Sequence, residues 1–250
     1  MANFDQDRFR TVAGARDTAI DQGLRSYMLS VYNYMAGGLA ITGVVAWLAF
    51  QAAVQQTPDG GLTLSPFGIT LYTSALKWVV MLAPLGLVFY LSARITSMSM
   101  TAAQMAFWIF AGLMGLSLSS VFLVYTGTSI TQTFFVTAIA FGSLSLYGYT
   151  TKRDLSAMGS FLFMGLIGII VASLVNIFLQ STALQFVVSV IGVLLFAGLT
   201  AYDTQRIKEM YWVGDSTVAA GKKAIMGALS LYLDFINMFM FLLQFMGNRR

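Results

Sequence analysis

Seven long apolar runs constrain this chain more than any other feature of its sequence. Each is roughly 18 to 27 residues long, and about 20 residues cross the hydrocarbon core of a bilayer as a helix. Charged residues make up only 10% of the chain, against about 25% in a typical soluble protein. We therefore expect an all-α membrane protein with seven transmembrane helices. The predicted spans are residues 27–54, 78–95, 104–125, 130–149, 158–179, 184–205 and 224–246.

The segments outside these spans predict a simple organisation. Residues 1–26 are polar and lack the pattern of a removable signal peptide, so we expect a cytoplasmic N-terminal tail. Residues 27–250 then form one transmembrane domain, because no connection is long enough to fold by itself. Eleven of the 14 Lys and Arg residues fall on the side of the N-terminus. The positive-inside rule therefore predicts a cytoplasmic N-terminus and a C-terminus outside.

The absence of histidine and cysteine excludes several kinds of chemistry. No disulfide can form, and neither a thiolate or imidazole metal site nor His or Cys catalysis is available. We expect a protein that is not an enzyme and holds no cofactor. The basic residues flank the apolar runs, so we expect contact with the lipid bilayer and no nucleic-acid binding. Any pH response near neutrality would have to come from carboxylates, because histidine is missing.

Two of the ten acidic residues lie inside apolar runs. Counting the helical rise places Asp234 about 15 Å into the seventh span and Asp203 about 7 to 8 Å from the end of the sixth. Arg94 ends the second span on the same side. A charge at membrane depth normally pairs with another or lines a watered cavity. We therefore expect these three groups in the cytoplasmic half of the bundle.

The seventh span also carries a stripe of six residues at steps of three and four, four of which are polar. It consists of Gly227, Ser230, Asp234, Asn237, Phe241 and Gln244. Such a stripe avoids lipid, so we expect the seventh helix to be the central one. In the sixth span, Thr200 lies one turn before Asp203 on the same face.

The aspartates allow three interpretations. A buried Asp203–Arg94 ion pair, or a hydrogen-bonded carboxyl, could simply fix the helix register. Alternatively, two neighbouring carboxylates share a proton, and its loss near neutral pH biases closure with Arg94 as a latch. Such a pair also offers oxygen ligands to Ca²⁺, if Ser230, Asn237, carbonyls or waters supply the rest. The third interpretation, an intramembrane aspartyl protease, fits Tyr202-Asp203 but lacks the Gly-x-Gly-Asp motif at Asp234.

Four stretches resemble one known family. Residues 196–205 read Phe-Ala-Gly-Leu-Thr-Ala-Tyr-Asp-Thr-Gln, and residues 231–237 read Leu-Tyr-Leu-Asp-Phe-Ile-Asn. Residues 146–155 (Leu-Tyr-Gly-Tyr-Thr-Thr-Lys-Arg-Asp-Leu) and 92–95 (Ser-Ala-Arg-Ile) add to the pattern. Together they resemble the Bax inhibitor-1 family, the transmembrane Bax inhibitor motif proteins, in its bacterial form.

The resemblance implies a pH-sensitive Ca²⁺ leak in the inner (plasma) membrane of a bacterium. Asp203 and Asp234 would be the proton-sensing pair, Arg94 the latch, and the seventh helix would be surrounded by the other six. The segment 206–223 looks longer than in compact members. Some bacterial relatives are associated with a membrane-anchored AAA+ protease. The alternative function is therefore a non-transporting regulator of that protease or of a stress response, which would contact it through the N-terminal tail.

Overall fold

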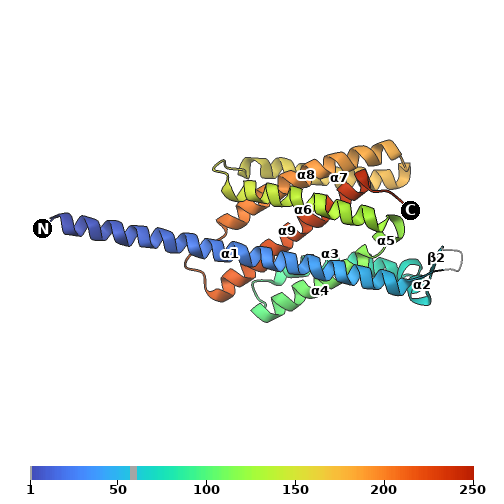
Figure 1. The fold of residues 1–250 in the computed structure, drawn as a ribbon, viewed down its shortest axis with the longest axis horizontal. Coiled ribbons are helices and arrows are strands. Elements are labelled where there is room, and N and C mark those ends of the chain that lie inside the picture. Colours follow the sequence, from blue (N-terminus) through green and yellow to red (C-terminus); the bar gives the residue numbers. More distant parts are fainter. Residues whose placement is uncertain (1, 57–60) are drawn as a thin grey trace.

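The computed structural model describes residues 2–56 and 61–250, with side chains from residue 21 onward. Within this part of the chain, seven helices are long and apolar enough to cross a membrane, which confirms the expected all-α bundle. Figure 1 shows them side by side in one elongated bundle. The membrane-spanning segments are Asp21–Ala53, Leu76–Arg94, Met100–Val124, Gly127–Thr150, Ser156–Leu179, Thr182–Glu209 and Thr217–Met246.

The elements follow one another with short connections. In chain order they are α1 (Ala2–Ala53), β1 (Val54–Gln56), β2 (Leu62–Leu64), α2 (Pro66–Thr73), α3 (Leu76–Arg94), α4 (Met100–Leu118), α5 (Val121–Val124), α6 (Gly127–Thr150), α7 (Ser156–Leu179), α8 (Thr182–Glu209) and α9 (Thr217–Met246). Helices suit the lipid core because their backbone hydrogen bonds are made inside each segment.

Hydroxyl side chains fix where several helices begin. The N-cap residues of α2, α4, α6, α8 and α9 each accept a hydrogen bond from the backbone N–H three residues later. These caps are Ser65, Ser99, Thr126, Ser181 and Ser216. Each cap satisfies one of the four N–H groups that a helix start leaves without an intrahelical partner.

The bundle has two distinct ends (Figure 1). The proximal end comprises the connections 95–99, 151–155 and 210–216, on the side from which α1 enters. The distal end comprises the β1–β2 hairpin, α2, the connections 125–126 and 180–181, and residues 247–250. The predicted cytoplasmic loops therefore all lie at the proximal end.

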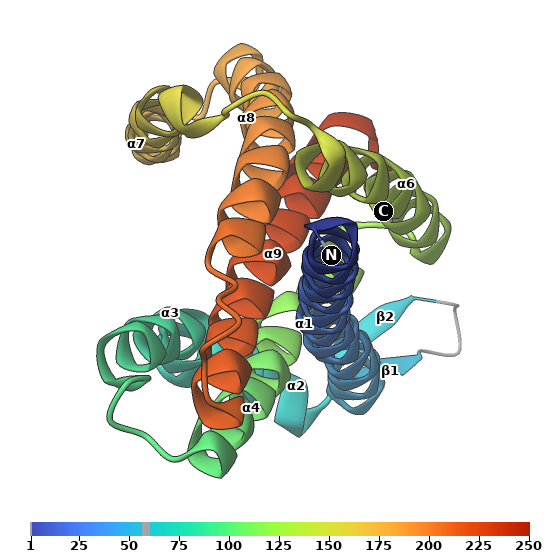
Figure 2. The same ribbon diagram turned by 90° about the vertical axis from the view of Figure 1, so that its left-hand side faces the viewer.

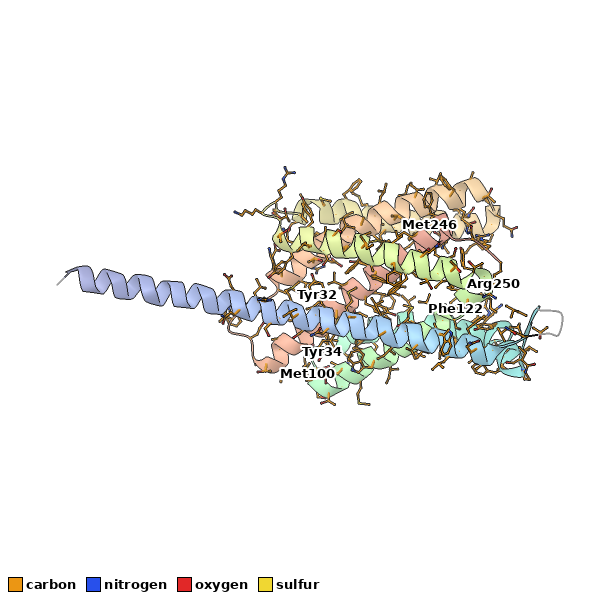
Figure 3. The ribbon with its side chains drawn as sticks, viewed as in Figure 1. Tyr32, Tyr34, Met100, Phe122, Met246 and Arg250 are labelled. Atoms are coloured by element: carbon orange, nitrogen blue, oxygen red, sulfur yellow. The ribbon has the colours of Figure 1, made fainter. Side chains whose placement is uncertain are left out.

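The distal end is held together by the C-terminus. The backbone N–H of Arg250 donates to the Val124 carbonyl at 2.9 Å, and its side chain donates to the Tyr125 carbonyl at 3.3 Å. The Arg250 guanidinium also lies 5.7 Å from the centre of the Phe50 ring. Figure 3 labels Arg250 beside Phe122, close to the end of α1. The chain end thus joins α1, α5 and α9.

The structure adds detail to the segments outside the predicted spans. Residues 2–26 do not form a separate backbone segment, because α1 runs without a break from Ala2 to Ala53. The connection between the last two spans is only 210–216, since α8 continues to Glu209 and α9 begins at Thr217. It is therefore shorter than the segment 206–223 expected from the sequence. The connection between the first two predicted spans contains β1, β2 and α2.

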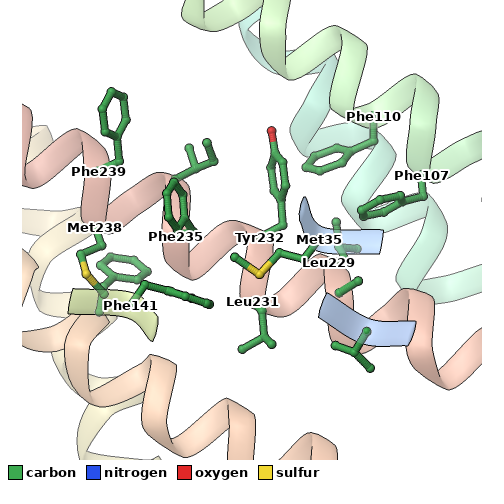
Figure 4. Close-up of a cluster of buried hydrophobic side chains, with 14 of the residues drawn as sticks. Met35, Phe107, Phe110, Phe141, Leu229, Leu231, Tyr232, Phe235, Met238 and Phe239 are labelled. Carbon is green, nitrogen blue, oxygen red and sulfur yellow. The ribbon is translucent and has the colours of Figure 1, made fainter. Parts of the chain in front are cut away.

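Helix α9 is the most buried of the seven spans. It packs against α8, α1, α6 and α4, whereas α3 packs mainly on α4, and α7 packs on α8 (Figure 2). Aromatic side chains fill the contacts around it: the Tyr232 ring lies edge-on to Phe110 at 5.1 Å, and Phe235 lies edge-on to Phe141 at 5.5 Å (Figure 4). Four of the six other spans therefore enclose most of α9.

Glycines allow the closest helix approaches. A Cβ on Gly148 of α6 would overlap the carbonyl oxygen of Ala201 in α8. A Cβ on Gly115 of α4 would lie 2.7 Å from the carbonyl oxygen of Thr42 in α1. Small residues at such contacts let backbones approach in lipid, where packing replaces the hydrophobic effect.

We expect Gly148→Ala to destabilise the bundle by about 1 to 3 kcal/mol, because the methyl group meets rigid backbone rather than a movable side chain. Thermal unfolding in detergent measures this loss. Gly168→Ala in α7 is the matched control, since nothing lies within 4 Å of a Cβ there. Equal melting temperatures for the two variants would contradict the close α6–α8 contact.

Candidate functional site

The two membrane-embedded aspartates lie on α8 and α9, which have the most extensive contact in the bundle. Asp234 is buried, with 5% of its surface exposed. Its Oδ2 atom has no hydrogen-bond partner among the described residues. Asp203 is half-buried, and the two carboxyl groups interact electrostatically. The structure thus brings together two acids that are 31 positions apart in the sequence.

Asp203 borders a cavity of about 550 Å³ between α7 and α8. Its polar lining also includes Ser156, Ser160 and Arg206. Gly159 shapes the wall, because a Cβ at that position would lie 2.7 Å from the Tyr202 hydroxyl. Since Ser156 and Arg206 belong to the proximal ends of their helices, Asp203 is connected to a polar space on that side.

The charged groups around Asp203 do not include Arg94, which one interpretation of the sequence had paired with it. The cation acting on Asp203 is Arg206, three residues further along α8. Arg94 is exposed at the end of α3. The only ion pair among the described side chains joins Lys223 and Asp215, at 2.6 Å. The Asp203–Arg94 ion pair is therefore not formed in this conformation.

The three supporting polar residues are largely engaged with their own helices. Thr200 is fully buried, and its hydroxyl donates to the Phe196 carbonyl at 2.7 Å. Half-buried Asn237 donates through Nδ2 to the Leu233 carbonyl at 2.8 Å, and Ser230 is also half-buried. In residues 21–56 and 61–250, whose side chains the structure describes, there is no group of three or more acidic, histidine or cysteine side chains that could hold a metal ion. Two carboxylates fall short of the six to eight oxygens that Ca²⁺ prefers.

A chain of buried hydroxyl groups beside Asp203 was not found by sequence reasoning. The Thr204 hydroxyl donates to the Thr200 carbonyl at 2.7 Å, so Ser145 must donate to Thr204 across 2.9 Å. Tyr32 must then donate to Ser145 across 2.7 Å. The chain links α1, α6 and α8. Thr204 could have been noticed as a polar residue directly after Asp203, but its partners lie on other helices.

Gln205 was also missed, although it belongs to the same motif. Its side chain accepts a hydrogen bond from the Leu155 backbone N–H and donates one to the Arg153 carbonyl, both at 2.8 Å. Lys208 adds a contact one turn later, donating to the Tyr149 carbonyl at 2.8 Å. Residues 204–208 therefore anchor α8 to the end of α6 and to the connection 151–155.

We expect Gln205→Leu to lower stability by about 1 to 3 kcal/mol, because it leaves the buried Leu155 N–H without its partner. Hydrogen exchange should increase at residues 153–155. Gln51→Leu is the control, since Gln51 is exposed and its side chain makes no hydrogen bond in the described part of the structure. Unchanged exchange at 153–155 would show that Gln205 does not hold this connection.

Fold and site together define a multi-pass membrane protein with an acidic pair between its last two helices. Residues 24–250 match the family described as "Inhibitor of apoptosis-promoting Bax1". The inner membrane protein YbhL of Escherichia coli is 48% identical over 91% of this chain and 94% of its own length. Uncharacterized proteins of Rickettsia prowazekii and Caulobacter vibrioides are 47% and 45% identical over 94% and 100% of this chain. The chain belongs to the Bax inhibitor-1 family, and it is a multi-pass inner-membrane protein.

Proposed function

We propose that this protein is a pH-sensitive calcium leak channel in which protonation of the Asp203–Asp234 pair controls the pathway. The observation that carries the proposal is the unpaired Oδ2 of Asp234, buried beside a second carboxyl group. An isolated ionised carboxylate is costly at membrane depth. A proton on the pair removes that cost. The charge of the pair, and with it the preferred conformation, therefore depends on pH.

We propose that ions and protons reach the aspartate pair from the proximal end of the bundle. The cavity beside Asp203 provides polar groups there. Beyond Asp234, α9 presents the buried apolar residues Phe235, Met238, Phe239 and Leu243 towards the distal end. Apolar constrictions of this kind can block ions by excluding water. We propose that this apolar layer is the barrier that must open for conduction.

Arg94 is proposed as the latch of a second conformation. The end of α3 is already tied to α9, since Lys222 donates to the Thr96 carbonyl at 2.9 Å. Loss of the shared proton would leave negative charge that attracts Arg94 towards the pair. The resulting contact would hold the pathway closed. The described conformation, with Arg94 disengaged, corresponds to the protonated state in this scheme.

Calcium enters the proposal as the transported ion. With only two carboxylates available, Ca²⁺ would keep part of its water shell at the pair. Weak, partly hydrated binding suits permeation, because an ion must leave a conducting site as well as enter it.

We expect Asp203→Asn and Asp234→Asn to flatten the pH dependence of Ca²⁺ flux in liposomes. In the wild-type protein, flux should fall as pH rises, because each proton lost shifts the equilibrium by up to about 1.4 kcal/mol per pH unit. The amides cannot lose that proton, so flux should persist at high pH. Calcium-sensitive dye inside the liposomes measures the rate at each pH.

Asp154→Asn is the matched control at the proximal end. Hydrogen bonds from the side chain and the backbone N–H of Ser156 hold the pKa of Asp154 below its usual value. This exposed carboxylate is therefore already ionised throughout the neutral range, and its replacement should leave the profile unchanged. Wild-type pH profiles in both Asp203→Asn and Asp234→Asn would reject the proton-sensing pair.

The alternative function, regulation of a membrane-anchored AAA+ protease or of a stress response without transport, is favoured by α1. The N-terminal part of this helix extends beyond the rest of the bundle at the proximal end (Figure 1). Such a projecting helix is available to a partner in a way that the enclosed helices are not.

Under this alternative, deleting residues 1–20 should abolish the effect on proteolysis while the bundle stays folded. The deletion ends before the buried residues Tyr27 and Met28, so the packed part of α1 is kept. Turnover of a membrane substrate in cells gives the readout, and ion flux in liposomes gives the control. If the truncated protein regulates proteolysis normally, α1 does not provide the contact.

A further inference from the structure

An apolar groove separates α1 from α6. Two cavities lie along it, of about 650 Å³ in the proximal half and about 320 Å³ in the distal half, and both are bordered by Leu39. The proximal cavity is lined by α1 and α6 alone. Both helices pack against α9, but they make no extensive contact with each other. Leu39 lies between the two cavities, which are therefore neighbours along this face of α1.

The groove walls have unused space at two glycines. Nothing lies within 4 Å of a Cβ built on Gly142 in α6 or on Gly43 in α1. Gly142 borders the proximal cavity, and Gly43 borders the distal one. Elsewhere in the bundle, glycines such as Gly148 and Gly115 bring backbones together. Gly142 and Gly43 make no such close contact, so they leave space in the walls of the two cavities.

The proximal mouth of the groove is cationic. Arg25 lines it, is exposed, and forms no ion pair with any side chain in residues 21–56 and 61–250. Tyr149 lines the same cavity, with the Lys208 ammonium 5.7 Å from its ring centre. An anionic group at this mouth would therefore meet positive charge.

Deeper in the groove, no hydroxyl hydrogen is left for an anion. Tyr32, labelled on α1 in Figure 3, and Ser145 line the proximal cavity. Their hydrogens are used within the chain of hydroxyl groups that ends at the Thr200 carbonyl. The inner wall thus suits hydrocarbon, and an anion would be bound at the mouth, where Arg25 lies.

The length of the groove matches one leaflet of a bilayer. Arg25 and Leu39 are 14 residues apart on α1, which corresponds to about 21 Å of helix. Half of a hydrocarbon core is about 15 Å, and the headgroup region adds about 5 to 7 Å. With Arg25 at the level of the lipid phosphates, Leu39 lies near the bilayer midplane.

We propose that the α1–α6 groove is a binding site for an anionic phospholipid of the proximal leaflet, with an acyl chain along Met28, Tyr32, Met35 and Leu39 and the phosphate at Arg25. This inference is independent of ion transport. It assigns Arg25 and Gly142 roles in lipid binding that neither the aspartate pair nor the latch requires.

Native mass spectrometry of the full chain, released from nanodiscs of equal phosphatidylglycerol and phosphatidylcholine, tests the proposal. We expect the wild-type protein to retain one phosphatidylglycerol preferentially. Arg25→Gln should lower this preference about fivefold, the effect of one basic residue at an anionic surface. Gly142→Leu places a side chain in the groove at a position where nothing lies within 4 Å of the Cβ, and it should abolish retention of the lipid.

Matched controls separate a specific site from the general lipid shell. Gly168→Leu places the same side chain at an equally open position on α7, and Arg94→Gln removes a proximal cation outside the groove. Both should retain the lipid as the wild-type protein does. Equal losses in Gly142→Leu and Gly168→Leu would overturn the proposal, as would full retention in Arg25→Gln. Displacement of the lipid by millimolar inorganic phosphate would also overturn it, because the site would then recognise free phosphate.

Discussion

The need to hide α9 from lipid shapes the rest of this bundle. The helix carries a carboxyl group at membrane depth, where an exposed charge or polar group is costly. Helices α1, α4, α6 and α8 cover most of it, and aromatic side chains such as Phe110 and Phe141 fill the contacts. This cover also isolates Asp234 from cations and leaves its Oδ2 unpaired. The packing that protects the helix therefore creates the unusual electrostatics of the site.

The positive charge at the proximal end has a structural use besides any topological one. Helices α3, α6 and α8 all end there, so their negative dipole ends and unpaired carbonyls face the same side. Lys208, Lys222 and Lys223 each donate to a backbone carbonyl in this region. The lysines thus join neighbouring segments and stabilise the helix ends at the proximal end of the bundle. Movements of this end would alter both the aspartate pair and the exposed Arg94.

The motif around Asp203 combines two tasks. Thr204 and Gln205 bind α8 to α6 and to the connection 151–155. Gly148, in the stretch at the end of α6, lets the Ala201 backbone approach closely. Two of the stretches on which the family resemblance rested, around residues 146–155 and 196–205, are thus in contact in the folded chain. Their joint presence in the sequence has a physical basis, because the two stretches pack against each other and share hydrogen bonds.

The sequence by itself determined the class of protein and the number of spans, because hydrophobic length is a local property. It also identified Asp203 and Asp234, since a carboxylate in an apolar run is visible without any partner. Only the tertiary structure decided which groups meet: it put Arg206 rather than Arg94 beside Asp203, and it joined Tyr32, Ser145 and Thr204 in one chain. It also showed that Asn237 bonds its own helix, and that Gln244 of the predicted stripe is exposed but accepts a hydrogen bond from Ser189 of α8. These outcomes depend on which face each helix turns inward and on which helices pack together. Both are set by packing between segments far apart in the chain.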